Sequence, residues 1–505
     1  MSTAALLQQA LQAHQQGKLD AAASLYRQVL ALAPRQFDAL HLLGVIARQQ
    51  GDAASAVALI RDALTVDPTQ ARAHCNLGAA LQDLGDAGAA LDSYERALQL
   101  DPCYPLAWDN RGNALRRLGR AQDAVHSYEQ ALGLKPDYPE AWRHRAIALH
   151  DLGRDADAVS SAERALQLRP GDVEAWLALG NALQALERLD EAVAAYDRGL
   201  AQAPRADLWC ARGSARKKAG DFNDALAGYE RALALRPDYA LAEHYRANTL
   251  RALGRTAEAI AAYRRALALG ADAGEIGFAL AALGQGERPA SAPQDYVKGL
   301  FDQYAGHFDR HLVDRLAYRT PSLLDGLLRT HLHATVDAAI DLGCGTGLCG
   351  PFLRPLARRL SGVDLSARML DKARETGLYD ELACADIVAF LEAAAPAGCD
   401  LLLAADVFVY IGDLAPVFGA AARALRPGGW FAFSVEALDA DDAGAGAGAQ
   451  ADYAITPSNR FAHALAYVER LAAQAGFASL ETRAAALRRE HGREVAGHLV
   501  LLRRL

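Results

Sequence analysis

A period of 34 residues runs through the first half of the chain and limits the folds available to it. Upstream of each proline that marks this period, a small residue recurs, and an alanine follows twelve positions after it. The prolines, with a single step of 33 at the end, are Pro34, Pro68, Pro102, Pro136, Pro170, Pro204 and Pro237. A repeat of this length predicts stacked copies of one unit, none of which buries its apolar face alone.

The residues at the repeated positions describe the unit. Small residues let two helices approach closely, a large aromatic fills the space between units, and proline ends the second helix because it cannot continue it. The small residues are Ala10, Gly44, Gly78, Gly112, Ala146, Gly180, Gly213 and Ala247. The pattern resembles the tetratricopeptide repeat (TPR), whose period is 34. The resemblance implies an all-α solenoid of about eight helix–turn–helix repeats over residues 3–273, with a concave face.

The resemblance to TPR proteins also implies that the concave face binds a protein or peptide. Several asparagines fall on the first helix of their repeats, where the amide has two possible uses. It pairs with the extended backbone of a partner, or it hydrogen-bonds between helices, and the sequence leaves both readings open. These asparagines are Asn76, Asn110, Asn113, Asn181 and Asn248. The recurring tryptophans are expected to be repeat-core residues: Trp108, Trp142, Trp176 and Trp209.

In the second half, an apolar run ends in an acid and then has glycine at every second position. It spans 339–347 and reads D-x-G-x-G-x-G from Asp341. The pattern predicts a strand, a tight turn and a helix that starts near Leu348. A helix N-terminus favours a carboxylate or phosphate group. A dinucleotide-binding turn requires its third glycine at the position of Leu348, which disfavours a nicotinamide-dependent oxidoreductase.

Three further strand-like runs end in an acid, at Asp364, Asp386 and Asp406. Ligands of open α/β sheets bind at the carboxyl ends of the strands. Asp364 stands 23 residues after the first acid, near the offset at which a carboxylate accepts hydrogen bonds from ribose hydroxyls. In the alternative interpretation, Ser366 caps a helix and Asp364 is structural. A Leu-Arg-Pro-Gly-Gly turn at 425–429 precedes another strand.

These ordered motifs resemble class I S-adenosylmethionine-dependent methyltransferases. The resemblance implies a Rossmann-like α/β domain of seven strands, with the last strand antiparallel, and S-adenosyl-L-methionine (SAM) as cofactor. In that family, the second acid binds ribose, the third binds the adenine amino group, and apolar side chains pack on adenine. Carried over position by position, the expected cofactor-binding residues are Asp341, Gly343, Cys344, Gly345, Gly347, Asp364, Leu365, Met369, Asp386, Ile387 and Asp406.

Between the two patterns lies a stretch rich in Gly, Ala and Pro. We place a linker at 274–293 and the methyltransferase domain at 294–505. An F-D-x-Y-A segment follows and resembles one that closes over the cofactor in this family. Tyr304 and Phe308 are therefore candidate lid residues, although packing against the core is the alternative and is preferred for Phe308. A Gly-Ala run at 441–452 is expected to form a loop.

Charge and cysteine usage exclude several classes of protein. A net charge of −8 and a pI near 6.0 disfavour a protein that coats nucleic acid or a membrane surface. The seven cysteines form no C-x-x-C pair, so no metal site is expected, and scattered thiols fit a reducing cytosol. Neither a signal peptide nor an apolar run of about 18 residues is visible. The sequence therefore predicts a cytoplasmic protein.

The catalytic residues are not readable from this pattern. Methyl transfer from a sulfonium is a displacement with a good leaving group, so positioning supplies most of the catalysis and a general base is optional. Members of the family that methylate amino groups of adenine or glutamine carry an Asn/Asp-Pro-Pro-aromatic motif. That motif is absent here, because Asp406 is followed by Val407 and not by proline. Weak candidates on the acceptor side are Tyr410, Tyr304, His463 and Arg460.

The sequence thus favours a SAM-dependent methyltransferase whose TPR domain recruits a protein or peptide partner or substrate. The alternative is a non-catalytic TPR adaptor with a vestigial or sensory SAM-binding domain. The intact glycines and acids favour the enzyme, because an idle site does not need all of them. The methyl acceptor, the acceptor atom, the partner and the oligomeric state stay open.

Overall fold

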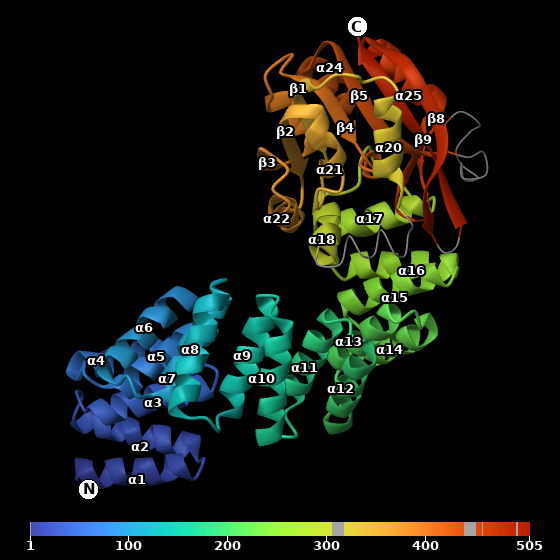
Figure 1. Ribbon diagram of the computed structural model, residues 1–505. Coiled ribbons are helices and arrows are strands. Elements are labelled where there is room, and N and C mark those ends of the chain that lie inside the picture. Colours follow the sequence, from blue (N-terminus) through green and yellow to red (C-terminus); the bar gives the residue numbers. More distant parts are fainter. Residues whose placement is uncertain (1, 306–317, 439–450, 457, 491–492) are drawn as a thin grey trace. The chain divides into compact units, whose positions relative to one another are not determined.

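The computed structural model describes residues 2–305, 318–438, 451–456, 458–490 and 493–505. The chain divides into two compact units, Met1–Arg255 and Thr256–Leu505, of which the first is helical and the second contains a sheet (Figure 1). The second unit begins inside the expected eighth repeat. The limits 3–273, 274–293 and 294–505 stay a prediction. Phe308 and most of the Gly-Ala run lie outside the described residues.

Consecutive helices of the first unit pack against one another as pairs, and each pair contacts the next. They are α1 (Thr3–Gln15), α2 (Leu19–Leu32), α3 (Phe37–Gln49), α4 (Ala53–Val66), α5 (Ala71–Asp83), α6 (Ala87–Leu100), α7 (Pro105–Arg117), α8 (Ala121–Leu134), α9 (Pro139–Asp151), α10 (Asp155–Leu168), α11 (Val173–Ala185), α12 (Leu189–Gln202), α13 (Ala206–Lys218), α14 (Phe222–Leu235) and α15 (Ala240–Ala252). The expected all-α TPR solenoid is confirmed.

In the pairs that carry glycine at the small position of the first helix, that glycine faces a large side chain, most often tyrosine, on the second helix. A Cβ added at Gly112 of α7 would lie 2.4 Å from Cε1 of Tyr128 on α8. The Tyr128 ring is fully buried, and its hydroxyl donates to Oδ1 of Asn113 at 2.9 Å. The same contact recurs between Gly180 and Tyr196, at 2.3 Å. This close approach explains why the 34-residue period keeps a small residue at that position.

We expect Gly112→Ala to destabilise the array by about 1–3 kcal/mol, because the added methyl group forces a pinned and buried ring to move. The control is Gly133→Ala on α8, whose added Cβ meets no heavy atom within 4 Å. Removing a helical glycine there should stabilise the helix by about 0.5–1 kcal/mol. Thermal unfolding followed by helical circular dichroism measures both. Shifts of the same sign in the two variants would contradict the packing account.

The repeated tryptophans and arginines are tied into the array itself. On α7, Arg111 donates to Glu95 Oε1 at 2.9 Å and to Ser127 Oγ at 2.7 Å, and its guanidinium lies over the Trp108 ring. One repeat later, Arg145 makes the equivalent three contacts, with Glu129, Ser161 and Trp142. The indole N–H of Trp108, Trp142 and Trp176 donates to a proline carbonyl in each case.

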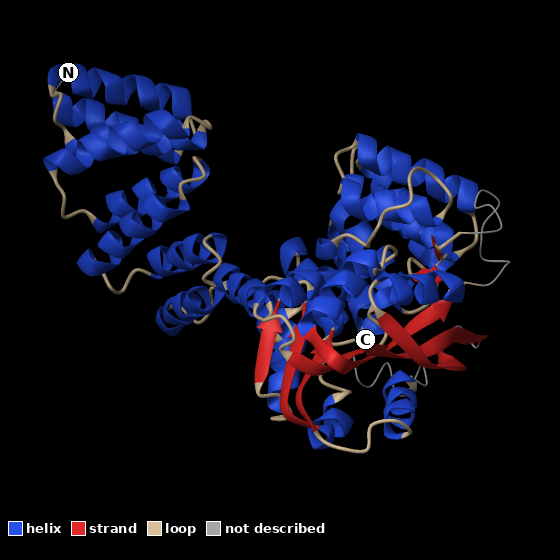
Figure 2. Ribbon diagram, turned by 90° about the horizontal axis from the view of Figure 1, so that it is seen from above, coloured by secondary structure: helices blue, strands red, loops and turns tan. Residues whose placement is uncertain are grey.

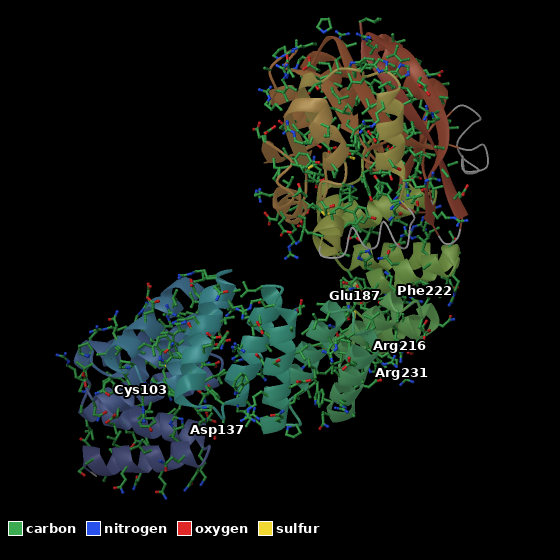
Figure 3. The ribbon with its side chains drawn as sticks, in the orientation of Figure 1. Cys103, Asp137, Glu187, Arg216, Phe222 and Arg231 are labelled. Atoms are coloured by element: carbon green, nitrogen blue, oxygen red, sulfur yellow. The ribbon has the colours of Figure 1, made fainter. Side chains whose placement is uncertain are left out.

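Trp209 on α13 follows the same rule. The guanidinium groups of Arg212 and Arg231 lie 5.6 and 5.3 Å from its ring centroid. Arg231 belongs to α14 and Arg216 to α13 (Figure 3). Arg216 forms an ion pair with Asp224 of α14 at 3.0 Å. These contacts link neighbouring helices, so the interpretation of the tryptophans as repeat-core residues fits the structure.

The asparagines of the first helices are also engaged within the array. Asn113 and Asn181 accept hydrogen bonds from the buried hydroxyls of Tyr128 and Tyr196, at 2.9 and 2.8 Å. Asn76 Nδ2 lies 2.9 Å from the ring nitrogen Nε2 of His41, 35 residues earlier. Of the two readings that the sequence left open, these contacts favour hydrogen bonding between helices for these three amides.

The second unit carries the remaining helices and one sheet. Its helices are α16 (Thr256–Ala268), α17 (Ala273–Ala282), α18 (Gln294–Tyr304), α20 (Thr320–Arg329), α21 (Gly350–Leu353), α22 (Ala367–Glu375), α23 (Ile387–Ala393), α24 (Ala415–Ala424) and α25 (Leu465–Gln474), with 3₁₀ turns at Arg354–Leu356 and Phe408–Tyr410. Its strands are β1 (Val336–Leu342), β2 (Ala357–Asp364), β3 (Glu381–Cys384), β4 (Cys399–Ala404), β5 (Leu425–Ala437), β6 (Tyr453–Ile455), β7 (Phe461–His463), β8 (Phe477–Glu490) and β9 (Arg493–Arg504).

The sheet has the topology expected of the methyltransferase fold. Strands β3, β2, β1, β4 and β5 run parallel in that order. β9 pairs antiparallel with β5 and with β8, so the last strand runs antiparallel as predicted. The sequence did not predict the short pair β6–β7, which extends the far end of β5. Strand β7 occupies 461–463, and the helix that follows, α25, starts at Leu465.

Helices cover both faces of the sheet (Figure 2). Along β4, Leu401 and Leu403 pack on the side of α20, and Leu402 and Ala404 pack on the side of α24 and α25. All four are fully buried. A strand buried on both faces is apolar throughout, which is why this run contains no alternation. Among the described residues, no helix is long and apolar enough to cross a membrane.

Candidate functional site

A cavity lies where the parallel strands β1, β2 and β4 end and where α23 begins. This edge is the position at which open α/β sheets bind ligands. Its lining residues are Ser291, Ala292, Gln294, Val297, Phe301, Tyr318, Pro321, Gly343, Cys344, Gly345, Thr346, Leu348, Cys349, Asp364, Leu365, Asp386, Ile387, Ala405, Asp406, Val407, Val409, Tyr410, Ile411, Arg460 and Arg488. Eight of the eleven predicted cofactor residues belong to this lining.

The glycine turn after β1 forms the floor of the cavity. Gly343 and Gly345 have φ of +64° and +55°, a region that L side chains rarely adopt. A Cβ on Gly343 would lie 2.5 Å from Cγ2 of Val407, so this close approach tolerates only glycine. The Cys344 N–H donates to the Val363 carbonyl at 3.0 Å and joins the turn to β2. Cys344 is buried, as expected of a small residue within the turn.

Asp364 connects the end of β2 to the glycine turn. Its Oδ2 accepts from the Gly345 N–H at 3.0 Å, and its Oδ1 accepts from the Ser366 N–H at 2.8 Å. Burial raises the pKa of Asp364, and these N–H groups oppose the rise. Ser366 caps α22 by accepting from the Met369 N–H, as the alternative interpretation required, while Asp364 lines the cavity. Each carboxylate oxygen keeps capacity for a further donor from a ligand.

Asp386 and Asp406 line the same cavity from two other elements. Asp386 caps α23, because its Oδ1 accepts from the N–H groups of Val388 and Ala389 at 2.9 and 3.0 Å. Asp406 follows β4 with φ of +56°, an uncommon conformation for a residue other than glycine. Strained residues of this kind cluster at ligand sites. Ser434 stabilises it, accepting from the Asp406 N–H at 2.9 Å and donating to its Oδ1 at 3.1 Å.

Three predicted cofactor residues, Asp341, Gly347 and Met369, do not line the cavity. Met369 is a buried residue of α22. Asp341 is 1% exposed and accepts at 2.6 Å from the hydroxyl of Tyr379, a residue that the sequence did not single out. Burial raises the pKa of Asp341 to about 7, against the effect of the tyrosine hydrogen bond. Asp341 is thus a buried residue next to the glycine turn and outside the cavity lining.

Asp341 gives a pH-dependent prediction. An acid whose pKa is raised on folding destabilises the folded state as pH rises between the unfolded and folded values, here from about 4 to about 7. We therefore expect Asp341→Asn to gain stability relative to the wild type across that range, by about 2 kcal/mol above pH 7 once the burial of the amide is included.

Urea unfolding of the full chain between pH 5 and pH 9 measures this gap. The control is Asp337→Asn on the same strand, whose side chain is 62% exposed. The control should keep a constant offset from the wild type. An Asp341→Asn gap that narrows with rising pH would contradict a buried carboxyl with a raised pKa.

The histidine and tyrosines among the weak catalytic candidates have different positions. Tyr410 lines the cavity and meets Phe301 edge to face at 5.5 Å, and burial raises the pKa of its hydroxyl. His463 is fully buried outside the lining, and its Nε2–H donates to the Ile411 and Gly412 carbonyls. Burial lowers the pKa of His463 to about 4, so it is neutral at physiological pH. The side chain of Tyr304 lies outside the described residues.

A buried ion-pair network closes one end of the cavity. Arg488 of β8 is 3% exposed and contacts Oδ2 of Asp406 at 3.3 Å and the carboxylate of Glu436 on β5. Arg460 also approaches Glu436, at 3.9 Å, and lines the cavity beside Arg488. No sequence motif singled out Arg488 or Glu436. One signal in the sequence could have identified Glu436. It is a charged residue that follows a largely apolar run in β5.

The wall opposite the sheet comes from the expected linker and from α18. Ser291, Ala292 and Gln294 line the cavity, followed by Val297 and Phe301. No motif marked the first three, and the first two belong to the expected linker 274–293, because a stretch of Gly, Ala, Ser and Pro reads as a connection. The structure therefore adds this wall to the site predicted from the sequence.

Family models match both halves of the chain. A methyltransferase domain model matches residues 340–433. Tetratricopeptide repeat models match residues 7–73, 110–173 and 210–274, and further models match 71–102 and 156–213.

Curated relatives match the methyltransferase half. The ubiquinone biosynthesis O-methyltransferase of Burkholderia vietnamiensis is 30% identical over 116 residues, which are 22% of this chain and 48% of that protein. The enzyme of the same name from Thiobacillus denitrificans is 34% identical over 102 residues, 19% of this chain and 42% of that protein. The chain thus spans about half the length of these relatives.

Among solved structures, MamA is 26% identical and covers 32% of this chain and 93% of its own, with a TM-score of 0.30. The fold and the family models agree on the order of the two parts. The chain therefore carries tetratricopeptide repeats in its first half and a methyltransferase domain in its second half.

Proposed function

We propose that the chain is a SAM-dependent methyltransferase whose TPR array recruits a protein or peptide partner or substrate. The observation that carries the proposal is the cavity itself. It brings the glycine turn, Asp364 and Asp386 together at the carboxyl ends of the parallel strands. In the sequence these groups are more than 40 residues apart from first to last.

The residues present fit the chemistry of SAM. A carboxylate with backbone N–H partners, as at Asp364, still accepts from vicinal ribose hydroxyls. Asp386 leaves Oδ2 for an amino group because its Oδ1 caps a helix. Leu365 and Ile387 offer apolar surface for the faces of a base. The positive φ of Gly343 and Gly345 lets the backbone approach a ligand closely.

When bound, SAM supplies an electrophilic methyl group on a sulfonium. The chain then has to hold the acceptor in line and exclude water, since positioning provides most of the rate. Three groups that line the cavity on the side of Asp406 can orient an acceptor there, namely Tyr410, Arg460 and Arg488. Asp406 is itself paired with Arg488, and its carboxylate oxygens can accept a further hydrogen bond from an acceptor molecule.

Recruitment by the repeats is supported by the tetratricopeptide repeat models that match the array. The amides of Asn76, Asn113 and Asn181 and the repeated tryptophans are engaged between helices. A partner would therefore meet other side chains of the array. The named relatives act in ubiquinone biosynthesis, but the shared region is about half of their length, so the acceptor of this chain is not inferred from them.

The test has two parts. Calorimetry with SAM on the full chain should give saturable binding, and incubation with methyl-labelled SAM and a lysate of the source organism should label a protein or peptide. Binding without transfer to any acceptor supports the non-catalytic adaptor. Transfer only to small molecules supports the methyltransferase activity and contradicts the recruitment of a protein or peptide substrate by the repeats. A folded chain that binds no SAM at millimolar concentration would overturn the proposal.

A further inference from the structure

The residues between α17 and α18 are attached to the cavity by backbone hydrogen bonds. The Ala292 N–H donates to the Tyr410 carbonyl at 2.8 Å. The Ala290 carbonyl accepts from the N–H groups of Gly412 and Asp413, each at 2.8 Å. Ala292 is 4% exposed. This segment is therefore held in one place against the edge of the site, although its composition is that of a connection.

Side-chain packing holds the same segment from both ends. Phe278 of α17 meets Phe461 of β7 with ring centroids 5.7 Å apart, in a core that includes Ala292 and Val297. On α18, Asp302 accepts from the Ser366 hydroxyl at 2.5 Å. The start of α18 is thus fixed in position relative to α22 and to β7, two elements of the second unit.

Gln294 is the first residue of α18 and lines the cavity. Its Nε2 donates to Oδ2 of Asp386 at 3.3 Å. The other oxygen of Asp386 is used by the cap of α23, where it accepts from Val388 and Ala389. Oδ2 is therefore the oxygen available to a ligand, and the Gln294 amide lies beside it.

The chemistry of the two groups fixes how the amide is oriented. A carboxylate only accepts hydrogen bonds, so the NH₂ of Gln294 must face Asp386 and its carbonyl oxygen is left as an acceptor. Two acceptor oxygens side by side match an exocyclic amino group, which has two hydrogens. Ile387, the first residue of α23, has an N–H without a partner inside its helix, which suits a ring nitrogen that accepts.

We propose that Gln294 is a specificity-determining residue that, together with Asp386, selects a 6-aminopurine over a 6-oxopurine in the cofactor. The inference rests on the proposed function, because it concerns the base of SAM. A 6-oxopurine presents an acceptor oxygen in place of the amino group and an N–H in place of the accepting ring nitrogen. Its oxygen would face the acceptor oxygens of Asp386 and Gln294, and its ring N–H would face the N–H of Ile387. The segment that follows the repeats thus supplies part of the cofactor site.

Calorimetry with S-adenosylhomocysteine and S-inosylhomocysteine tests the inference without any methyl transfer. The full chain is compared with Gln294→Leu and with Gln285→Leu, the same substitution in the same segment but outside the cavity lining. The adenosyl ligand should bind Gln294→Leu about five- to tenfold more weakly than the wild type, with little change for the inosyl ligand. The ratio of the two affinities falls by that factor, and Gln285→Leu keeps the wild-type ratio.

Each outcome has one meaning. An unchanged affinity ratio in Gln294→Leu, with the adenosyl ligand still bound, overturns the role of Gln294 and leaves the proposed function intact. Failure of both ligands to bind the folded wild type overturns the proposed function and the inference with it. Equal weakening of both ligands shows that Gln294 supports the wall without reading the base, which also overturns the proposal. Gln294 is exposed, so the variant is expected to fold.

Discussion

The full chain carrying Gly345→Arg is expected to lose SAM binding by ~100-fold or more, below detection by calorimetry at millimolar ligand. Gly345 lines the cavity with φ of +55°, and its N–H donates to Asp364. A long side chain at this residue occupies space at the cavity floor, and the positive φ disfavours any residue with a Cβ. Both effects act on the turn that the proposed cofactor must approach most closely.

The matched control is Gly419→Arg, an exposed position on α24 where an added Cβ meets no heavy atom within 4 Å. This variant should bind SAM like the wild type. At 100 times its dissociation constant, the ligand should stabilise the wild type and the control by ~2.7 kcal/mol, seen as a thermal shift that Gly345→Arg lacks. Wild-type affinity in a folded Gly345→Arg chain would remove the glycine turn from the cofactor site.

The parts of the structure that the sequence predicted are those specified by local pattern. The contact between Gly112 and Tyr128 has equivalents in other repeats, so the 34-residue period carries the packing of the array in itself. In the second unit, acids at the ends of apolar runs meet at one edge because parallel strands align their carboxyl ends. Asp364 and Asp386 were found by this argument, and both line the cavity.

The parts that were missed depend on contacts between distant segments. Asp341 has the residue type and place of a site residue, yet it bonds to Tyr379, 38 residues later, and lies below the cavity. Gln294 reaches Asp386 across 92 residues of sequence, from a stretch without any motif. Composition identifies the stretch that ends just before Gln294 as a connection, but only the strand pairing of the whole sheet decides what this part of the chain touches.

Arg488 is the strongest case of a long-range contact, and its removal should have a large effect on stability. Replacing it in Arg488→Met leaves the carboxylates of Glu436 and Asp406 without their shared cation, in a place where Arg488 is 3% exposed. Breaking a buried pair by removing one partner costs about 3–5 kcal/mol, because an uncompensated charge stays buried. We therefore expect a loss of that size in the unfolding free energy of the second unit, measured by urea titration with hydrogen exchange of β9.

Two controls separate the charge effect from general damage to β8. Arg483→Met removes a partly exposed pair with Glu481 on the same strand and should cost much less than Arg488→Met. Adding Glu436→Gln to Arg488→Met should recover part of the loss, since a neutral amide replaces one stranded carboxylate. Burial raises the pKa of Glu436, and losing the arginine raises it further, so the deficit of Arg488→Met should shrink as pH falls and the carboxyl takes up a proton. A deficit that is independent of pH, or no recovery in the double variant, would mean that Arg488 stabilises the domain through packing of its side chain and that the cost of the buried charges is small.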